Sequence, residues 1–138
     1  MNTHAGRQAV LKALLIASVV STGLHFSHNF VQVDSYPQTD LVSNTAVQVA
    51  ILVSWPLLTA VGLLGYRLYS RGRYAPAYAC LGAYSLLGIS TLGHFLAGSP
   101  DIPAFWYATI FTDGLAGFSI VAFIAWSAQV SAPAPAAR

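Results

Sequence analysis

Long apolar stretches separated by short polar ones set the pattern of this chain. Four apolar segments, at about residues 10–31, 45–69, 74–97 and 103–129, follow one another along the sequence. A helix that crosses the hydrocarbon core of a bilayer needs about 20 apolar residues, because each residue adds about 1.5 Å to its length. Lipid offers the backbone no hydrogen bonds, so each segment is predicted to be a helix. The pattern predicts an all-α, integral membrane four-helix bundle whose helices run up, down, up and down.

The connections between these segments predict a single domain over residues 1–130. The link at residues 70–73 is short, so the second and third helices are expected to form an antiparallel hairpin. The longer first connection contains Tyr36 and Pro37 and is expected to cap one end of the bundle. Residues 131–138 are rich in Ala and Pro and are predicted to form a disordered tail.

Charge is scarce, and this scarcity excludes several classes of protein. Only 7% of the residues are charged, whereas a soluble domain carries about 25%. Ordinary soluble and disordered proteins are therefore excluded. A net charge of +2 from scattered residues gives no basic face for a nucleic acid. The expected partner is the lipid bilayer, and a homo-oligomer or a larger complex stays open.

The positive charges predict the orientation in the membrane. All Lys and Arg residues fall on one side of the predicted topology, whereas the opposite connections carry only Asp residues. Because Lys and Arg favour the cytoplasmic side, both termini are predicted to be cytoplasmic in a multi-pass protein of the cell inner membrane. The residues are Arg7, Lys12, Arg67, Arg71, Arg73 and Arg138 on the first side, and Asp34, Asp40 and Asp101 on the second.

A polar stripe runs along the first helix. Its members recur at spacings of three and four residues, which places them on one face of an α-helix. In a bilayer such a face is expected to turn into the bundle, away from lipid. Shorter polar series on the third and fourth helices predict a shared polar pocket. The stripe comprises Ser18, Ser21, Thr22, His25, His28, Asn29 and Gln32.

Three histidines and one aspartate fall in the outer-leaflet half of the predicted bundle. His25, His28 and His94 are expected at depths of about 9, 5 and 5 Å, and Asp113 at about 15 Å. A carboxylate at that depth costs at least about 2.5–3.5 kcal/mol unless it is paired, protonated or hydrated. Asp113 is therefore the residue whose position most strongly indicates a function.

These residues predict a transition-metal site. Imidazole suits Zn, Cu and Fe, so His25, His28 and His94 are the predicted metal ligands. Asp113 lies deeper and is expected to orient a ligand or to act as a general base on metal-bound water. A substrate of such a site is expected to be lipophilic.

Other interpretations of the same residues stay open. In a metal-free enzyme or binding protein, His25 and Asp113 would be the catalytic pair that moves protons on a hydrophobic small molecule. Alternatively, the polar stripe is an assembly surface, and the chain is an accessory subunit of a larger membrane complex. Haem held by His94 and by His25 or His28 is the weaker alternative, because no CxxCH motif is present.

Three further residues carry expectations about structure alone. Cys80 is the single cysteine and can form no disulfide within the chain. Pro56 lies inside the second segment and is expected to kink that helix. His4 lies near the N-terminus and is expected to be solvated.

Overall fold

The computed structural model describes residues 3–37 and 42–131, and all regular structure within them is helical. Within the described residues, four helical spans are long and apolar enough to cross a membrane. The four-helix prediction is therefore confirmed. The elements are α1 (His4–Val31), η1 (Val33–Ser35), α2 (Asn44–Ser70), α3 (Tyr74–Ser90), η2 (Thr91–Gly93), α4 (His94–Ala97) and α5 (Ala104–Ser131). The third span, Tyr74–Ala97, consists of α3 and α4 with the short 3₁₀ helix η2 between them.

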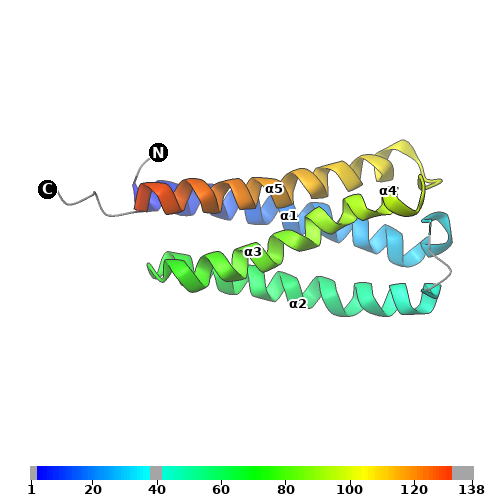
Figure 1. The fold of residues 1–138 in the computed structure, drawn as a ribbon, viewed down its shortest axis with the longest axis horizontal. Helices are drawn as coiled ribbons and strands as arrows, with labels where there is room; N and C mark the ends of the chain where they lie inside the picture. The colour runs from blue at the N-terminus through cyan, green and yellow to red at the C-terminus, as the bar shows by residue number, and fades with distance from the viewer. Residues whose placement is uncertain (1–2, 38–41, 132–138) are drawn as a thin grey trace, which may run out of the picture.

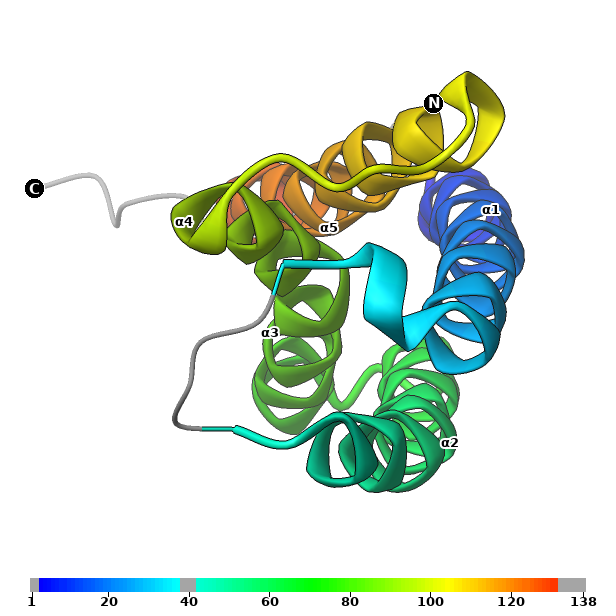
Figure 2. The same cartoon turned by 90° about the vertical axis from the view of Figure 1, so that its right-hand side faces the viewer.

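The long helices form a ring in the order α1, α2, α3 and α5. Each of them packs against its two neighbours, and α1 and α3 touch only slightly across the middle. Figure 1 shows that α1 begins and α5 ends at the end of the bundle that holds the α2–α3 turn, which we call the termini end. The opposite end, which we call the η1 end, holds η1 and the α4–α5 connection (Figure 2). Asp40 and residues 132–138 of the predicted tail lie outside the described residues.

Helix α1 begins at His4, six residues before the predicted start. The side chain of Thr3 caps it by accepting a hydrogen bond from the backbone N–H of Gly6, at 3.2 Å. One turn later, Gln8 donates to the backbone carbonyl of Ser70 at the end of α2. Capping and this contact between helices explain why the polar start of the chain continues the apolar segment as one helix.

A polar and aromatic cluster, which was not predicted, closes the termini end. The Nε of Arg7 donates to the hydroxyl of Tyr69 at 3.1 Å, although Arg7 is only 8% exposed. The hydroxyls of Tyr69 and Tyr78 both contact Ser127 of α5, at 2.7 and 3.0 Å. The ring of His4 stacks on Tyr69 with 5.6 Å between centroids. His4 was expected to be solvated, and its side chain is in fact half-buried because one face of the ring packs into this cluster.

The third span is not the continuous helix that was predicted, because it is interrupted at η2. The hydroxyls of Ser90 and Thr91 each donate to a backbone carbonyl three residues earlier, and Thr91 also reaches the carbonyl of Ile110 in α5. Such local bonds compete with the regular helical pattern and favour a short 3₁₀ turn. Figure 1 shows that the third span begins beside α2 and ends, at α4, beside α5.

Two glycines let α3 and α5 approach closely. A Cβ atom on Gly88 would collide with the backbone carbonyl of Asp113, and one on Gly117 would lie 2.7 Å from that of Ser85. In lipid, close packing of small residues replaces the hydrophobic drive that holds soluble helices together. By contrast, α2 continues as one helix through Pro56. It is also mostly exposed, since only 11% of its most apolar 18-residue stretch is buried.

Candidate functional site

The polar stripe of α1 faces the interior of the bundle in part, since four of its seven residues are buried and Gln32 at its end is exposed. Ser18, Thr22, His25 and Asn29 are all buried, at spacings of three and four residues. The apolar side chains between them, which include Ile16, Val20 and Leu24, are exposed on the outside of the bundle. This distribution is the one expected for a helix whose outer face contacts lipid.

Two histidines from different spans meet near the η1 end. The Nε2 atom of His25 lies 3.4 Å from the Nε2 atom of His94, the first residue of α4. The side chain of His25 is completely buried. Because η2 turns the third span toward α5, His94 projects from a separate short helix and reaches α1.

The hydrogen bonds of Thr109 fix which nitrogen of His25 carries the proton. The Thr109 hydroxyl donates its only proton to the backbone carbonyl of Trp106, at 2.6 Å. Its oxygen lies 3.1 Å from Nδ1 of His25 and must accept there. His25 therefore carries its proton on Nδ1 and turns the lone pair of Nε2 toward His94.

Asn29 contacts the other histidine of the pair. Its Nδ2 atom lies 3.2 Å from Nε2 of His94 and donates to it, so the lone pair of this nitrogen accepts from Asn29. The Oδ1 atom of Asn29 is buried and has no hydrogen-bond partner among the described residues. Two ring nitrogens and an unsatisfied amide oxygen therefore lie close together, and donors of these types bind cations. We call His25, His94 and Asn29 the imidazole pair site.

Tyr36 covers this site from the η1 end. Its side chain is only 2% exposed, and its ring centroid lies 4.9 Å from that of His94. Burial, together with the charge of Asp113, raises the pKa of Tyr36 to about 12. The backbone N–H of Asp101 donates to the carbonyl of Ser35, which joins the two connections at this end. The expectation that the first connection caps the bundle is confirmed.

The structure does not bring His28 to the imidazole pair site. Its Nδ1 atom lies 2.8 Å from the hydroxyl of Tyr36, and its ring stacks on Trp106 with 4.4 Å between centroids. Among the described residues, no group of three or more His, Cys, Asp or Glu side chains is placed to hold a metal ion. Of the three predicted ligands, only His25 and His94 therefore converge.

Asp113 lies one turn further along α5 than Thr109 and is completely buried. Its Oδ1 atom accepts a hydrogen bond from Ser21, whose hydroxyl also contacts that of Thr112 at 2.8 Å. Its Oδ2 atom has no hydrogen-bond partner in residues 3–37 and 42–131. Asp113 was expected to orient a ligand or to act as a general base, but the group that contacts Nδ1 of His25 is Thr109.

Comparison with known proteins found no family model, no curated protein and no solved structure that matches this chain. The functional interpretation therefore depends on the geometry of the site.

Proposed function

We propose that this protein is a multi-pass membrane protein that binds one divalent transition-metal ion at the imidazole pair site. The observation that carries the proposal is the 3.4 Å separation of the Nε2 atoms of His25 and His94. Two nitrogens that each lie about 2.0–2.1 Å from a tetrahedral ion are about 3.3–3.4 Å apart. The two rings are thus spaced as two ligands of one ion would be.

The surrounding groups support a metal ion in this position. Thr109 accepts a hydrogen bond from Nδ1 of His25 and thereby keeps Nε2 free for coordination. A histidine that binds a metal almost always donates its other ring N–H to an acceptor in this way. Rotation of the Asn29 amide would bring its unsatisfied oxygen toward His94 as a third donor. A fourth position would then be open to water or to a polar group of a lipophilic substrate. Imidazole donors suit Cu²⁺ and Zn²⁺, and Cu²⁺ binds such sites most tightly.

The distribution of charge supports an orientation with the termini in the cytoplasm of a cell whose inner membrane holds the protein. Arg7, Arg67 and Arg71 belong to the termini end, whereas Asp34 and Asp101 belong to the η1 end. In this orientation the imidazole pair site lies in the outer-leaflet half of the membrane. An ion would reach it from the extracytoplasmic side, past Asp34, Asp101 and Tyr36.

The experiment compares metal binding by three single variants. The purified protein in detergent is stripped with a chelator, loaded with Cu²⁺ or Zn²⁺, freed of excess ion and subjected to elemental analysis. We expect about one ion per chain, and the Cu²⁺ form should show nitrogen hyperfine splitting from imidazole in its electron paramagnetic resonance spectrum. The variants His25→Ala and His94→Ala should lose this binding.

The matched control is His28→Ala, which removes the same side chain outside the imidazole pair site and should keep one ion per chain. Absence of bound Cu²⁺ and Zn²⁺ in the unsubstituted protein would overturn the proposal. Equal loss of binding in all three variants would contradict the assignment of ligands.

Metal-free proton transfer is the second candidate, because the unpartnered Oδ2 atom of Asp113 is an observation in its favour. A carboxyl group buried in a membrane span is costly unless it is protonated or hydrated. In that case Asp113 would exchange protons through Ser21 and Thr112. Metal analysis separates the candidates, since Asp113→Asn should leave metal binding by His25 and His94 intact.

A further inference from the structure

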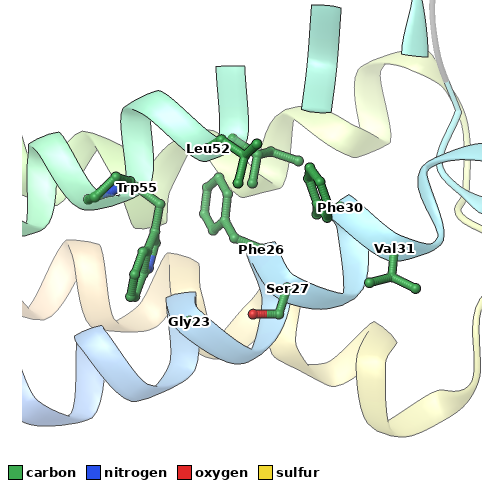
Figure 3. A pocket seen from close by; sticks show the side chains of 9 residues that line it. Gly23, Phe26, Ser27, Phe30, Val31, Leu52 and Trp55 are labelled. Atoms are coloured by element: carbon green, nitrogen blue, oxygen red, sulfur yellow. The ribbon is translucent and has the colours of Figure 1, made fainter. Parts of the chain in front are cut away.

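A groove opens between α1 and α2 in the half of the bundle near the η1 end (Figure 3). Its volume is about 480 Å³, which is within the range of small-molecule pockets. Aromatic rings supply much of its wall, and Figure 3 shows Phe26 and Phe30 from α1 beside Trp55 from α2. The lining residues are Gly23, Phe26, Ser27, Phe30, Val31, Ile51, Leu52, Trp55 and Pro56.

The bend of the third span accounts for this groove. Because α3 turns away toward α5, the first half of α2 is left with little packing, and Ile51 is its only buried residue among those described. Two hydrogen bonds hold it to α1. Gln48 donates to the backbone carbonyl of Phe30 at 2.9 Å, and the indole N–H of Trp55 donates to Thr22 at 3.2 Å. The walls are thus fixed while the space between them stays open.

The mouth of the groove faces the side of the bundle that would contact hydrocarbon. Leu52 is 59% exposed there, and both helices are candidate membrane spans. A molecule that enters from this side must therefore dissolve in lipid.

Two polar groups distinguish this groove from an ordinary lipid contact. Pro56 has no backbone N–H, so the carbonyl of Leu52 lacks the partner that a helix normally provides four residues later. An unsatisfied carbonyl in hydrocarbon requires a donor. Ser27 is among the residues that line the groove, and its hydroxyl makes no hydrogen bond within the described part of the chain.

We propose that this groove binds a lipid-soluble alcohol, with its apolar body against the aromatic wall and its hydroxyl hydrogen-bonded in the groove. The hydroxyl donates to the carbonyl of Leu52, and Ser27 offers a second polar contact. Binding in this groove does not depend on the proposed metal ion. The groove and the imidazole pair site are neighbours, because the ring of Phe26 contacts that of His25 edge-on, with 5.6 Å between centroids.

A second groove on the same seam provides an internal comparison. It lies nearer the termini end, has a volume of about 290 Å³ and is lined by Leu15, Val19, Leu63 and Tyr66, among others. No polar surface lines it. An ordinary acyl chain fits there, whereas a hydroxyl group would find no partner.

The test uses the full chain, free of metal, in phosphatidylcholine vesicles. Trp106 and Trp126 are replaced by Phe, so that Trp55 is the only fluorescent indole. The probes are dibrominated stearyl alcohol and the dibrominated alkane of equal length, since bromine quenches indole fluorescence on contact. We expect saturable quenching by the alcohol, with an affinity about two- to tenfold higher than that of the alkane, as one hydrogen bond provides.

Two variants decide the assignment. Pro56→Ala restores the missing N–H in a residue that favours helix, so the preference for the alcohol should disappear. Ser27→Phe fills the groove from an exposed position and should abolish saturable quenching. Leu63→Ala in the second groove is the control and should change neither result. Equal quenching by both probes, or saturable quenching that survives Ser27→Phe, would overturn the proposal.

Discussion

The contact between α3 and α5 gives the sharpest test of how this bundle holds together. In Gly88→Ala the new Cβ would overlap the backbone oxygen of Asp113 and lie 3.2 and 3.3 Å from two further backbone atoms. Backbone atoms cannot rotate aside, so the two helices must separate. Overpacking of this kind costs about 1–3 kcal/mol. In lipid, separating the helices lowers the stability of the bundle, because close packing is the main force that holds membrane helices together.

Gly82→Ala is the matched control, because it makes the same chemical change in the same helix where no atom lies within 4 Å. Both variants gain up to about 1 kcal/mol from the higher helix propensity of Ala, and this gain cancels in the comparison. The expected difference in the free energy of unfolding is therefore about 1–3 kcal/mol. The assay is unfolding by dodecyl sulfate in mixed micelles, followed by circular dichroism. Equal stability of the two variants would refute the packing argument.

Three further substitutions test other parts of the structure. Thr109→Val removes the acceptor of the His25 Nδ1 proton and should weaken Cu²⁺ binding about 10–100-fold in competition with a chelator; unchanged affinity would contradict its orienting role. Because the pKa of Tyr36 is raised from 10.0 to about 12, the unfolded chain ionises this tyrosine first, and stability should fall as the pH rises through this interval. Tyr36→Phe should remove that part of the fall and a step near pH 12 in the ultraviolet tyrosinate titration, and persistence of both would contradict the assignment. Tyr69→Phe leaves Arg7 and Ser127 without a shared partner and should cost about 1–3 kcal/mol in micelle unfolding, whereas Tyr66→Phe should cost little.

The fold could be predicted from the sequence because helices long and apolar enough to cross a membrane are recognisable by length and composition alone. The predicted segments agree with the ends of the observed spans to within two residues, except that α1 begins six residues earlier than predicted. The third span is also interrupted at η2, where a continuous helix was predicted. The early start of α1 depends on a cap by Thr3 and a contact with Ser70, which hydropathy does not record. The break at η2 depends on hydroxyl groups that bond to backbone carbonyls, and in sequence these look like ordinary polar residues of a span.

The site could be predicted only in part. Helical periodicity correctly placed His25 in the interior, and its depth correctly grouped it with His94. Tyr36 was missed because nothing in a loop sequence shows that its ring folds back among the histidines. Thr109 belongs to the polar series of the fourth segment, but its role could not be predicted, because it depends on where the hydroxyl proton goes. The convergence of His28 stays a prediction that the geometry does not support.

The packing of α3 against α5 determines where the imidazole pair site and the groove lie. Gly88 brings α3 against α5, and this closeness allows Thr91 to reach the carbonyl of Ile110. That bond accompanies the 3₁₀ turn, which places His94 at the start of a separate short helix facing His25. The same turn withdraws the third span from α2 and leaves the groove beside Trp55. A single departure from regular helix, set by two glycine contacts and one hydroxyl, therefore underlies both sites proposed for this protein.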